Sequence, residues 1–159
     1  MEALMEWLPN NIPEGEETVA LVHGDYRLDN MIFHPTEPRI IGILDWELST
    51  LGDPLADLAY QLMAWQFPRE GGIAGLAGLD RDELGLPSDE DYIAAYCQRT
   101  GRSGIDNWPF YMAFCFFRIA AILQGIKKRA QIGTASSAEA DSRAIMVGPL
   151  AALGAACIP

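Results

Sequence analysis

Leu21-Val-His-Gly-Asp-Tyr-Arg-Leu-Asp-Asn30 and, further along the chain, Ile43-Leu-Asp-Trp-Glu47 are the stretches that decide the fold. Within them, Asp25 and Asn30 lie five positions apart, and Asp45 comes fifteen positions after Asn30. This spacing predicts that one acid, one amide and a second acid lie at the ends of two neighbouring strands.

Two short runs rich in branched apolar residues flank the polar loop and predict strands. They are Leu21–Val22 and Arg39–Leu44, with a turn at His34-Pro-Thr-Glu-Pro38 before the second run. Gly24 precedes Asp25 and allows the backbone to form a tight loop. Buried strands on both sides of such a loop would hold its polar groups rigidly.

The three polar residues suit the transfer of a phosphoryl group to a hydroxyl. That reaction needs a carboxylate that orients the attacking hydroxyl and accepts its proton, and oxygen ligands that fix magnesium on the phosphates. Asp25 would be the base, and Asn30 and Asp45 offer the oxygen ligands that magnesium prefers. Taken singly, each residue has a structural alternative. Asp25, Asp29 and Asn30 could shape a turn. Asp45 could simply end a strand.

A family resemblance rests on three consecutive motifs. His23-Gly-Asp-Tyr-Arg-Leu-Asp-Asn30 and Ile43–Glu47, followed by Ser49-Thr-Leu-Gly-Asp-Pro-Leu-Ala-Asp-Leu-Ala59, resemble the C-terminal lobe of the aminoglycoside phosphotransferase family. That family is a branch of the protein-kinase-like superfamily, and the motifs are most similar to the kinase-like domains of some acyl-CoA dehydrogenases. The match is continuous from about Val19 to Tyr60. The resemblance implies an α+β, mostly α-helical lobe in which a small β element carries the catalytic loop.

The same resemblance implies roles for individual residues. Asp25 would be the catalytic base, and Asn30 and Asp45 would hold magnesium at the phosphates, so ATP and Mg²⁺ are the expected cofactors. His23 is interpreted as structural. Asp57 would brace the catalytic loop from the next helix.

Three more residues close to the motifs are candidates for supporting roles. Arg27 lies inside the loop, where it either faces substrate or phosphate or makes a structural ion pair. Asp53 is interpreted as the N-cap of a helix, with Pro54 at the first helical position. Glu47 could add a third metal ligand, although we do not favour this.

The kinase-like fold binds its nucleotide between two lobes, and the N-terminal lobe carries a glycine-rich strand pair and a lysine. Residues 1–21 contain neither feature, and Glu2–Leu8 predicts a helix. Gly71–Gly78 is interpreted as a flexible loop and not as a phosphate cradle. We therefore expect residues 1–159 to form a single domain, the C-terminal lobe of a longer kinase or of a truncated product. Such a chain should have little or no kinase activity by itself, because the nucleotide-binding lobe is absent from it.

Charge and composition set limits on the partners. Half of the residues are hydrophobic, the formal net charge is −11 and the pI is about 4.4. Such a chain has no electrostatic reason to bind nucleic acid or an anionic membrane. The acidity either attracts cationic acceptors, as aminoglycosides are, or only aids solubility. An apolar surface that once faced the absent lobe would favour a homodimer or pairing with a separate lobe.

Three features indicate a cytoplasmic protein. Cys97, Cys115 and Cys157 are odd in number and form no CxxC pair, which argues for a reducing compartment and against a zinc site. No signal peptide opens the chain. The apolar run Phe110–Phe117 is stopped by Arg118 and falls short of a bilayer span.

The remainder of the chain has the periodicity of helices. We predict helices at Asp53–Trp65, from a cap at Ser88 to a stop at Gly101, from Pro109 to about Ile132, and from about Ala138 to Ala156. An irregular connection should run from Phe67 to Pro87. The first half of the helix that starts at Pro109 is apolar almost all round, so it should be the central buried helix.

Aromatic side chains of these helices have two interpretations. Either they line an acceptor pocket or, as we favour, they are core; they are Tyr92, Tyr96, Trp108, Tyr111 and Phe114. Arg118 is a candidate substrate contact, because a charge inside an apolar helix needs a partner or a ligand. Lys127, Lys128 and Arg129 are interpreted as a solvated helix end.

Two functions are compatible with the sequence. The first is an ATP-dependent phosphotransferase whose full-length form acts on a small-molecule hydroxyl, in an aminoglycoside or in a hydroxylated acyl or other metabolite. The second is a non-catalytic remnant lobe that acts as a binding or dimerisation module. The intact set of Asp25, Asn30 and Asp45 favours the first, because a decayed remnant would be expected to lose one of them.

Overall fold

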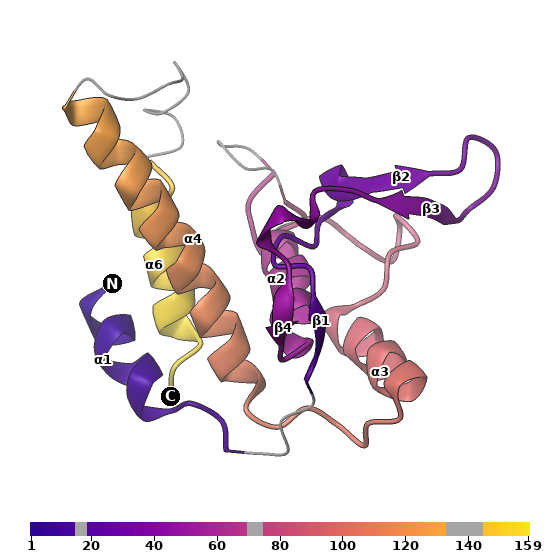
Figure 1. The fold of residues 1–159 in the computed structure, drawn as a ribbon, viewed down its shortest axis with the longest axis horizontal. Coiled ribbons are helices and arrows are strands. Elements are labelled where there is room, and N and C mark those ends of the chain that lie inside the picture. Colours follow the sequence, from indigo (N-terminus) through magenta and orange to yellow (C-terminus); the bar gives the residue numbers. More distant parts are fainter. Residues whose placement is uncertain (15–18, 70–74, 133–144) are drawn as a thin grey trace. The chain divides into compact units, whose positions relative to one another are not determined.

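The computed structural model describes residues 1–14, 19–69, 75–132 and 145–159. The chain divides into two compact units, and each is considered by itself. One unit is Glu14–Gln61, and the other combines Met1–Pro13 with Leu62–Pro159. Figure 1 shows the strands in the first unit and most of the helices in the second.

The first unit contains two separate antiparallel strand pairs. β1 (Ala20–Val22) pairs with β4 (Thr50–Gly52), and β2 (Met31–Phe33) pairs with β3 (Ile40–Ile43). In Figure 1, β2 and β3 form an extended hairpin. Two 3-10 turns lie beside the strands: η1 (Leu28–Asn30) precedes β2, and η2 (Trp46–Leu48) lies between β3 and β4. The loops between the strands carry the candidate site.

The strands expected at Leu21–Val22 and Arg39–Leu44 are confirmed, as β1 and β3. β2 and β4 were not predicted. Each has only three residues, too few to show the alternation of a strand, and β1, which is as short, was predicted only from its apolar residues beside the polar loop. Pairing with the predicted strands fixes both of them.

Five helices account for about half of the described chain. They are α1 (Glu2–Asn10), α2 (Leu55–Trp65), α3 (Asp89–Thr100), α4 (Trp108–Gln131) and α6 (Val147–Ala156). With four short strands beside them, the expected α+β class with mostly helical content is confirmed. The first part of the predicted last helix, residues 138–144, lies outside the described residues, as do residues 133–137 and 71–74.

The predicted helix boundaries are confirmed by their caps. The Asp53 carboxylate accepts a hydrogen bond from the Leu55 N–H at 2.9 Å. The Ser88 hydroxyl accepts one from the Asp91 N–H at 3.0 Å, and α3 ends at Gly101, whose φ of 72° suits glycine. Local side-chain chemistry therefore sets where these helices begin and end.

The core of the second unit forms where α4 packs against α6 and α1, as Figure 1 shows. Leu4, Leu8 and Ala113 make a buried cluster at this junction. The expected central role of α4 is confirmed along one side of the helix, where seven residues are buried. Its outer side is open, with Phe114 40% exposed.

The helix that contains the apolar run is longer than the run itself. α4 has 24 residues and is long and apolar enough to cross a membrane, by length and composition only, in contrast to the expectation drawn from Phe110–Phe117. The core helix of a soluble protein passes the same test, so this is weak evidence for a membrane span.

The expectation that the aromatic stripe is core is wrong in its detail. Phe114 is exposed, and the other four side chains are half-buried; they are Tyr92, Tyr96, Trp108 and Tyr111. Three of them pack on other rings: Tyr92 on Trp65 with ring centroids 5.0 Å apart, and Trp108 on Tyr111 with centroids 6.5 Å apart. The core is filled by aliphatic side chains and by the pair Phe67 and Phe116, whose centroids are 6.2 Å apart. Helical spacing alone does not distinguish the centre of a core from its rim.

Candidate active site

The loop after β1 is held from the start of α2. The Asp57 carboxylate accepts a hydrogen bond from the His23 N–H at 2.6 Å with one oxygen, and from the Gly24 N–H at 2.9 Å with the other. Hydrogen bonds to a charged acceptor are among the stronger ones in proteins. Asp57 therefore fixes the backbone that leads into Asp25.

Gly24 is the residue at which this loop turns most tightly. Its φ is 82°, and a Cβ atom there would lie 2.6 Å from the carbonyl oxygen of Leu48. An L-residue would be strained by the dihedral angle and would also collide with the backbone of η2 (Trp46–Leu48). The close approach of these two segments requires glycine.

Asn30 joins the candidate base to the end of β3. Its side-chain nitrogen donates to the Asp25 carbonyl oxygen at 2.9 Å and to the Asp25 carboxylate at 3.1 Å. The backbone carbonyl oxygen of Asn30 accepts a hydrogen bond from the Leu44 N–H at 2.8 Å. Because the amide nitrogen makes both contacts with Asp25, the amide oxygen lies outside them and is suited to a cation.

Asp45 comes two residues after the end of β3 and has a left-handed backbone, with φ 65° and ψ 54°. Such a conformation is uncommon for any residue except glycine, and Asp and Asn adopt it more readily than most. The Asp45 residue is exposed. A single strained position at the end of a strand is typical of functional sites.

The donor set fits magnesium better than a transition metal. Among the residues that the structure describes, no group of three or more His, Cys, Asp and Glu side chains could hold a metal ion. One carboxylate and one amide oxygen, from Asp45 and Asn30, are hard ligands of the kind that hold magnesium together with substrate phosphates and water. Two such ligands would leave the other positions around a magnesium ion to water or to phosphate oxygens.

The His23 side chain is almost fully buried, with 2% of its surface exposed, and its ring connects both motifs. The Asp25 N–H lies 3.2 Å from Nδ1, and the Leu44 carbonyl oxygen lies 2.8 Å from Nε2. Trp46 packs on this ring, with centroids 4.7 Å apart. No role for Trp46 follows from the sequence, because no local pattern pairs positions so far apart. The interpretation of His23 as structural stays a prediction.

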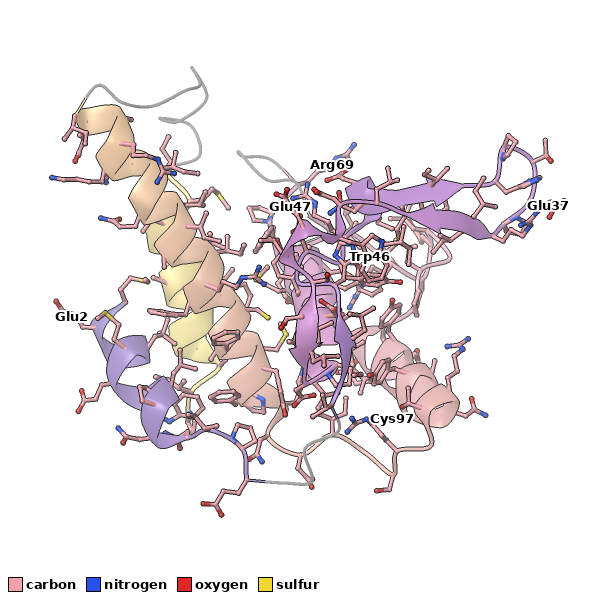
Figure 2. All side chains as sticks on the ribbon, viewed as in Figure 1. Glu2, Glu37, Trp46, Glu47, Arg69 and Cys97 are labelled. Carbon is pink, nitrogen blue, oxygen red and sulfur yellow. The ribbon has the colours of Figure 1, made fainter. Side chains whose placement is uncertain are left out.

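Trp46 and Glu47 lie on the segment between β3 and β4 and are labelled in Figure 2. The Trp46 indole N–H donates to the Ile43 carbonyl oxygen at 2.9 Å. Glu47, at the same turn, is exposed.

Arg27 makes an ion pair with Asp29 within the loop. The hydrogen bond to Asp29 raises the pKa of Arg27, partial burial opposes the change, and the charges of Asp29 and Asp25 add to it. The guanidinium is therefore charged at any ordinary pH and lies in the field of the candidate base. Arg118 lies half-buried on α4, in the other unit of the chain. Its contact with substrate stays a prediction.

Comparison with known proteins places most of the chain in a family. Residues 1–113 match the phosphotransferase enzyme family. A crystal structure of a candidate aminoglycoside phosphotransferase from Ralstonia eutropha JMP134 superposes with a TM-score of 0.92 and 50% identity, over 98% of this chain and 47% of that one. The resemblance to the C-terminal lobe of such a fold is thereby confirmed.

Two curated relatives extend the comparison. Acyl-CoA dehydrogenase family member 10 of Mus musculus is 50% identical over 154 residues, which are 96% of this chain and 14% of the relative. Acyl-CoA dehydrogenase family member 11 of Homo sapiens is 42% identical over 155 residues, which are 97% of this chain and 20% of the relative. The chain thus spans a small part of these relatives and about half of the solved neighbour. On its sequence and its fold, the chain belongs to the phosphotransferase enzyme family.

Proposed function

We propose that this chain carries the catalytic centre of an ATP-dependent phosphotransferase that acts on an alcohol. The observation that carries the proposal is the contact of the Asn30 amide with the Asp25 carboxylate, 3.1 Å apart, on a loop braced by Asp57. A base and a neutral oxygen ligand are thus held next to each other. Phosphoryl transfer depends mainly on such positioning and on charge stabilisation.

In the proposed reaction, Asp25 orients the hydroxyl of the acceptor and accepts its proton. The acceptor oxygen then forms a bond to the γ-phosphorus of ATP, and the bond to ADP breaks. Asn30 and Asp45 would hold a magnesium ion, which would neutralise charge on the phosphates when bound. Arg27, charged and two residues after Asp25, would face the transferred phosphate once it leaves Asp29. His23 and Asp57 would keep the loop in place.

We infer that the acceptor is a hydroxylated acyl compound. Two relatives that contain a segment similar to nearly all of this chain are named as acyl-CoA dehydrogenases, so this segment occurs in the same polypeptides as acyl chemistry. The solved neighbour is named for aminoglycosides, and the net charge of −11 would suit such cationic acceptors. Aminoglycosides are therefore the competing class.

The full reaction should need more polypeptide than these 159 residues. The solved neighbour has about twice the length that the chain covers. On β1 and β4, the cross-strand partners Leu21 and Leu51 are 61% and 73% exposed. Apolar pairs of this kind are usually covered by another protein surface. We propose that the covering surface is a nucleotide-binding lobe, and that the isolated chain has little or no activity.

A second candidate function is a non-catalytic binding or dimerisation module. The same exposed pair favours it, because a second copy of the chain could cover Leu21 and Leu51. This candidate predicts a dimer at micromolar concentration in sedimentation experiments, and no dependence of any activity on Asp25.

A hybrid chain tests the proposed reaction. In the hybrid, this chain replaces the matching segment of the Ralstonia eutropha neighbour, and ATP turnover is measured with hydroxylated acyl thioesters and with aminoglycosides. We expect magnesium-dependent phosphorylation of the acyl alcohol, and a loss of about 100- to 10,000-fold in kcat for Asp25→Asn. The matched control is Asp29→Asn, which changes an acid of the same loop that is not assigned as base. Turnover that survives Asp25→Asn unchanged would rule out the assigned base.

A further inference from the structure

The imidazole of His23 is in contact with both halves of the candidate site. It lies at the end of β1, and its ring nitrogens reach the Asp25 N–H at 3.2 Å and the Leu44 carbonyl oxygen at 2.8 Å. Leu44 is the residue before Asp45. A rotation of this one ring would therefore release the backbone next to the base and the backbone next to the metal ligand.

The two contacts define the tautomer of His23. A backbone N–H can only donate, so Nδ1 accepts from Asp25 and carries no proton. Nε2 must then carry the proton, which it donates to the Leu44 carbonyl oxygen. The opposite tautomer would place a donor against the Asp25 N–H and an acceptor against a carbonyl oxygen.

Two aromatic side chains lie against this ring. The Tyr26 ring is edge-on to it, with centroids 6.1 Å apart. Trp46 is closer, with its ring centroid 4.7 Å from that of His23 and the two planes inclined by 52°. The indole N–H is bound to the Ile43 carbonyl oxygen at 2.9 Å, so the ring is fixed at its polar edge as well. Trp46 is also the residue after Asp45, whose left-handed backbone directs the chain into η2.

We propose that Trp46 is a positioning residue, which holds the His23 ring in the orientation in which Nδ1 accepts from the Asp25 N–H and Nε2 donates to the Leu44 carbonyl oxygen, and thereby fixes Asp25 and Asp45 relative to each other before any substrate binds. The indole acts through the imidazole and not on substrate. The inference rests on the proposed function for the reacting roles of Asp25 and Asp45. The contact itself does not depend on that function and can be tested without activity.

The test uses the 159-residue chain with ¹⁵N-labelled histidine. Ring nitrogen shifts in NMR spectra report the tautomer of His23, with His34→Asn as the variant that assigns the two histidines, and amide hydrogen exchange reports the Asp25 N–H. We expect the Nε2-protonated tautomer in the unsubstituted chain. In Trp46→Leu we expect a mixture of tautomers and an exchange rate of the Asp25 amide that is about tenfold higher. Trp46→Phe keeps an aromatic ring on His23 and should restore the single tautomer.

Trp108→Leu is the matched control, because it removes an indole from α4 in the other unit and should leave His23 unchanged. If Trp46 only added stability, Trp46→Leu would have a lower melting temperature, but His23 would keep the same tautomer in the folded variant. An unchanged tautomer and unchanged Asp25 exchange in folded Trp46→Leu would overturn the inference. If Trp46→Leu does not fold, a Nδ1-protonated His23 in the unsubstituted chain would overturn it equally. Failure of the proposed function would show separately, as turnover of the hybrid chain that does not depend on Asp25.

Discussion

Gly24 and Asp45 both have positive φ values, one on each motif of the candidate site, and they tolerate different substitutions. At Gly24 the obstacle to a side chain is backbone, the carbonyl oxygen of Leu48, which cannot move aside cheaply. At Asp45 the space is already occupied by a side chain, and Asn accepts the same left-handed conformation. Asp45→Asn therefore removes the charge without adding strain, whereas Asp45→Ala would change both.

Gly24→Ala should destabilise the chain more than Gly78→Ala does. The two glycines have nearly equal φ values, 82° and 80°, but a Cβ at Gly78 would meet nothing within 4 Å. Both variants carry the dihedral strain, and only Gly24→Ala carries the collision. We expect its free energy of unfolding, measured by urea denaturation, to fall by about 2 kcal/mol more. Equal losses in the two variants would contradict the close approach of Gly24 to Leu48.

The residues of the candidate site could be predicted from the sequence only where they belong to a continuous motif. Asp25, Asn30 and Asp45 stand in recognisable motifs, so their proximity could be expected from spacing and resemblance. The contact of Trp46 with His23 could not, because it depends on the left-handed turn at Asp45. No sequence pattern distinguishes an Asp that turns in this way from one that only ends a strand.

At the scale of elements, α2 supports the loop after β1 through one side chain. The two oxygens of Asp57 each accept one backbone N–H, from His23 and from Gly24. In Asp57→Asn, an NH₂ group would meet one of those donors. We expect the free energy of unfolding to fall by about 1–3 kcal/mol, with faster amide exchange at His23 and Gly24.

Asp80→Asn is the matched control for that variant. A single oxygen of Asp80 accepts from the Asp82 and Glu83 N–H groups, so the carbonyl oxygen of an asparagine can make both bonds. This variant should be nearly neutral in the same denaturation experiment. A loss as large in Asp80→Asn as in Asp57→Asn would show that the two-oxygen arrangement has no special importance.

The packing of α6 gives a second prediction at this scale. A Cβ at Gly154 would lie 2.9 Å from Leu4 Cδ1 and 3.0 Å from Phe116 Cβ, whereas at Gly125 in α4 it would meet only Arg129 at 3.7 Å. Alanine favours a helix over glycine by about 0.5–1 kcal/mol. Gly125→Ala should therefore raise the melting temperature, and Gly154→Ala should lower it because the overpacking outweighs the gain. A higher melting temperature in Gly154→Ala would show that α1, α4 and α6 pack less closely than described.

Elements were predictable to different degrees for physical reasons. Caps such as Ser88 and Gly101 are local, and α3 could be placed from them within a residue. β4 has three residues and exists through its pairing with β1, which is a long-range interaction. The aromatic side chains of α4 have the spacing of a core, but only packing against neighbouring helices decides which of them are buried.

At the scale of the whole molecule, the chain has the complete set of proposed catalytic residues on about half of the length of its solved neighbour. Asp25, Asn30 and Asp45 all belong to one compact unit, Glu14–Gln61. That the residues form a single domain, as expected from the sequence, stays a prediction. Sequence reasoning could identify the family from the motifs, but the acceptor depends on surfaces that no motif encodes.

The measurement that tests the central claim most directly is the calorimetry of Mg²⁺·ATP binding to the hybrid chain, because binding does not depend on knowing the acceptor. We predict that Asp45→Asn weakens binding at least about tenfold, whereas Asp25→Asn leaves it nearly unchanged, since the base is needed for transfer and not for binding. Equal affinity for Mg²⁺·ATP in the unsubstituted hybrid and in Asp45→Asn would contradict the assignment of a magnesium–phosphate site to this chain.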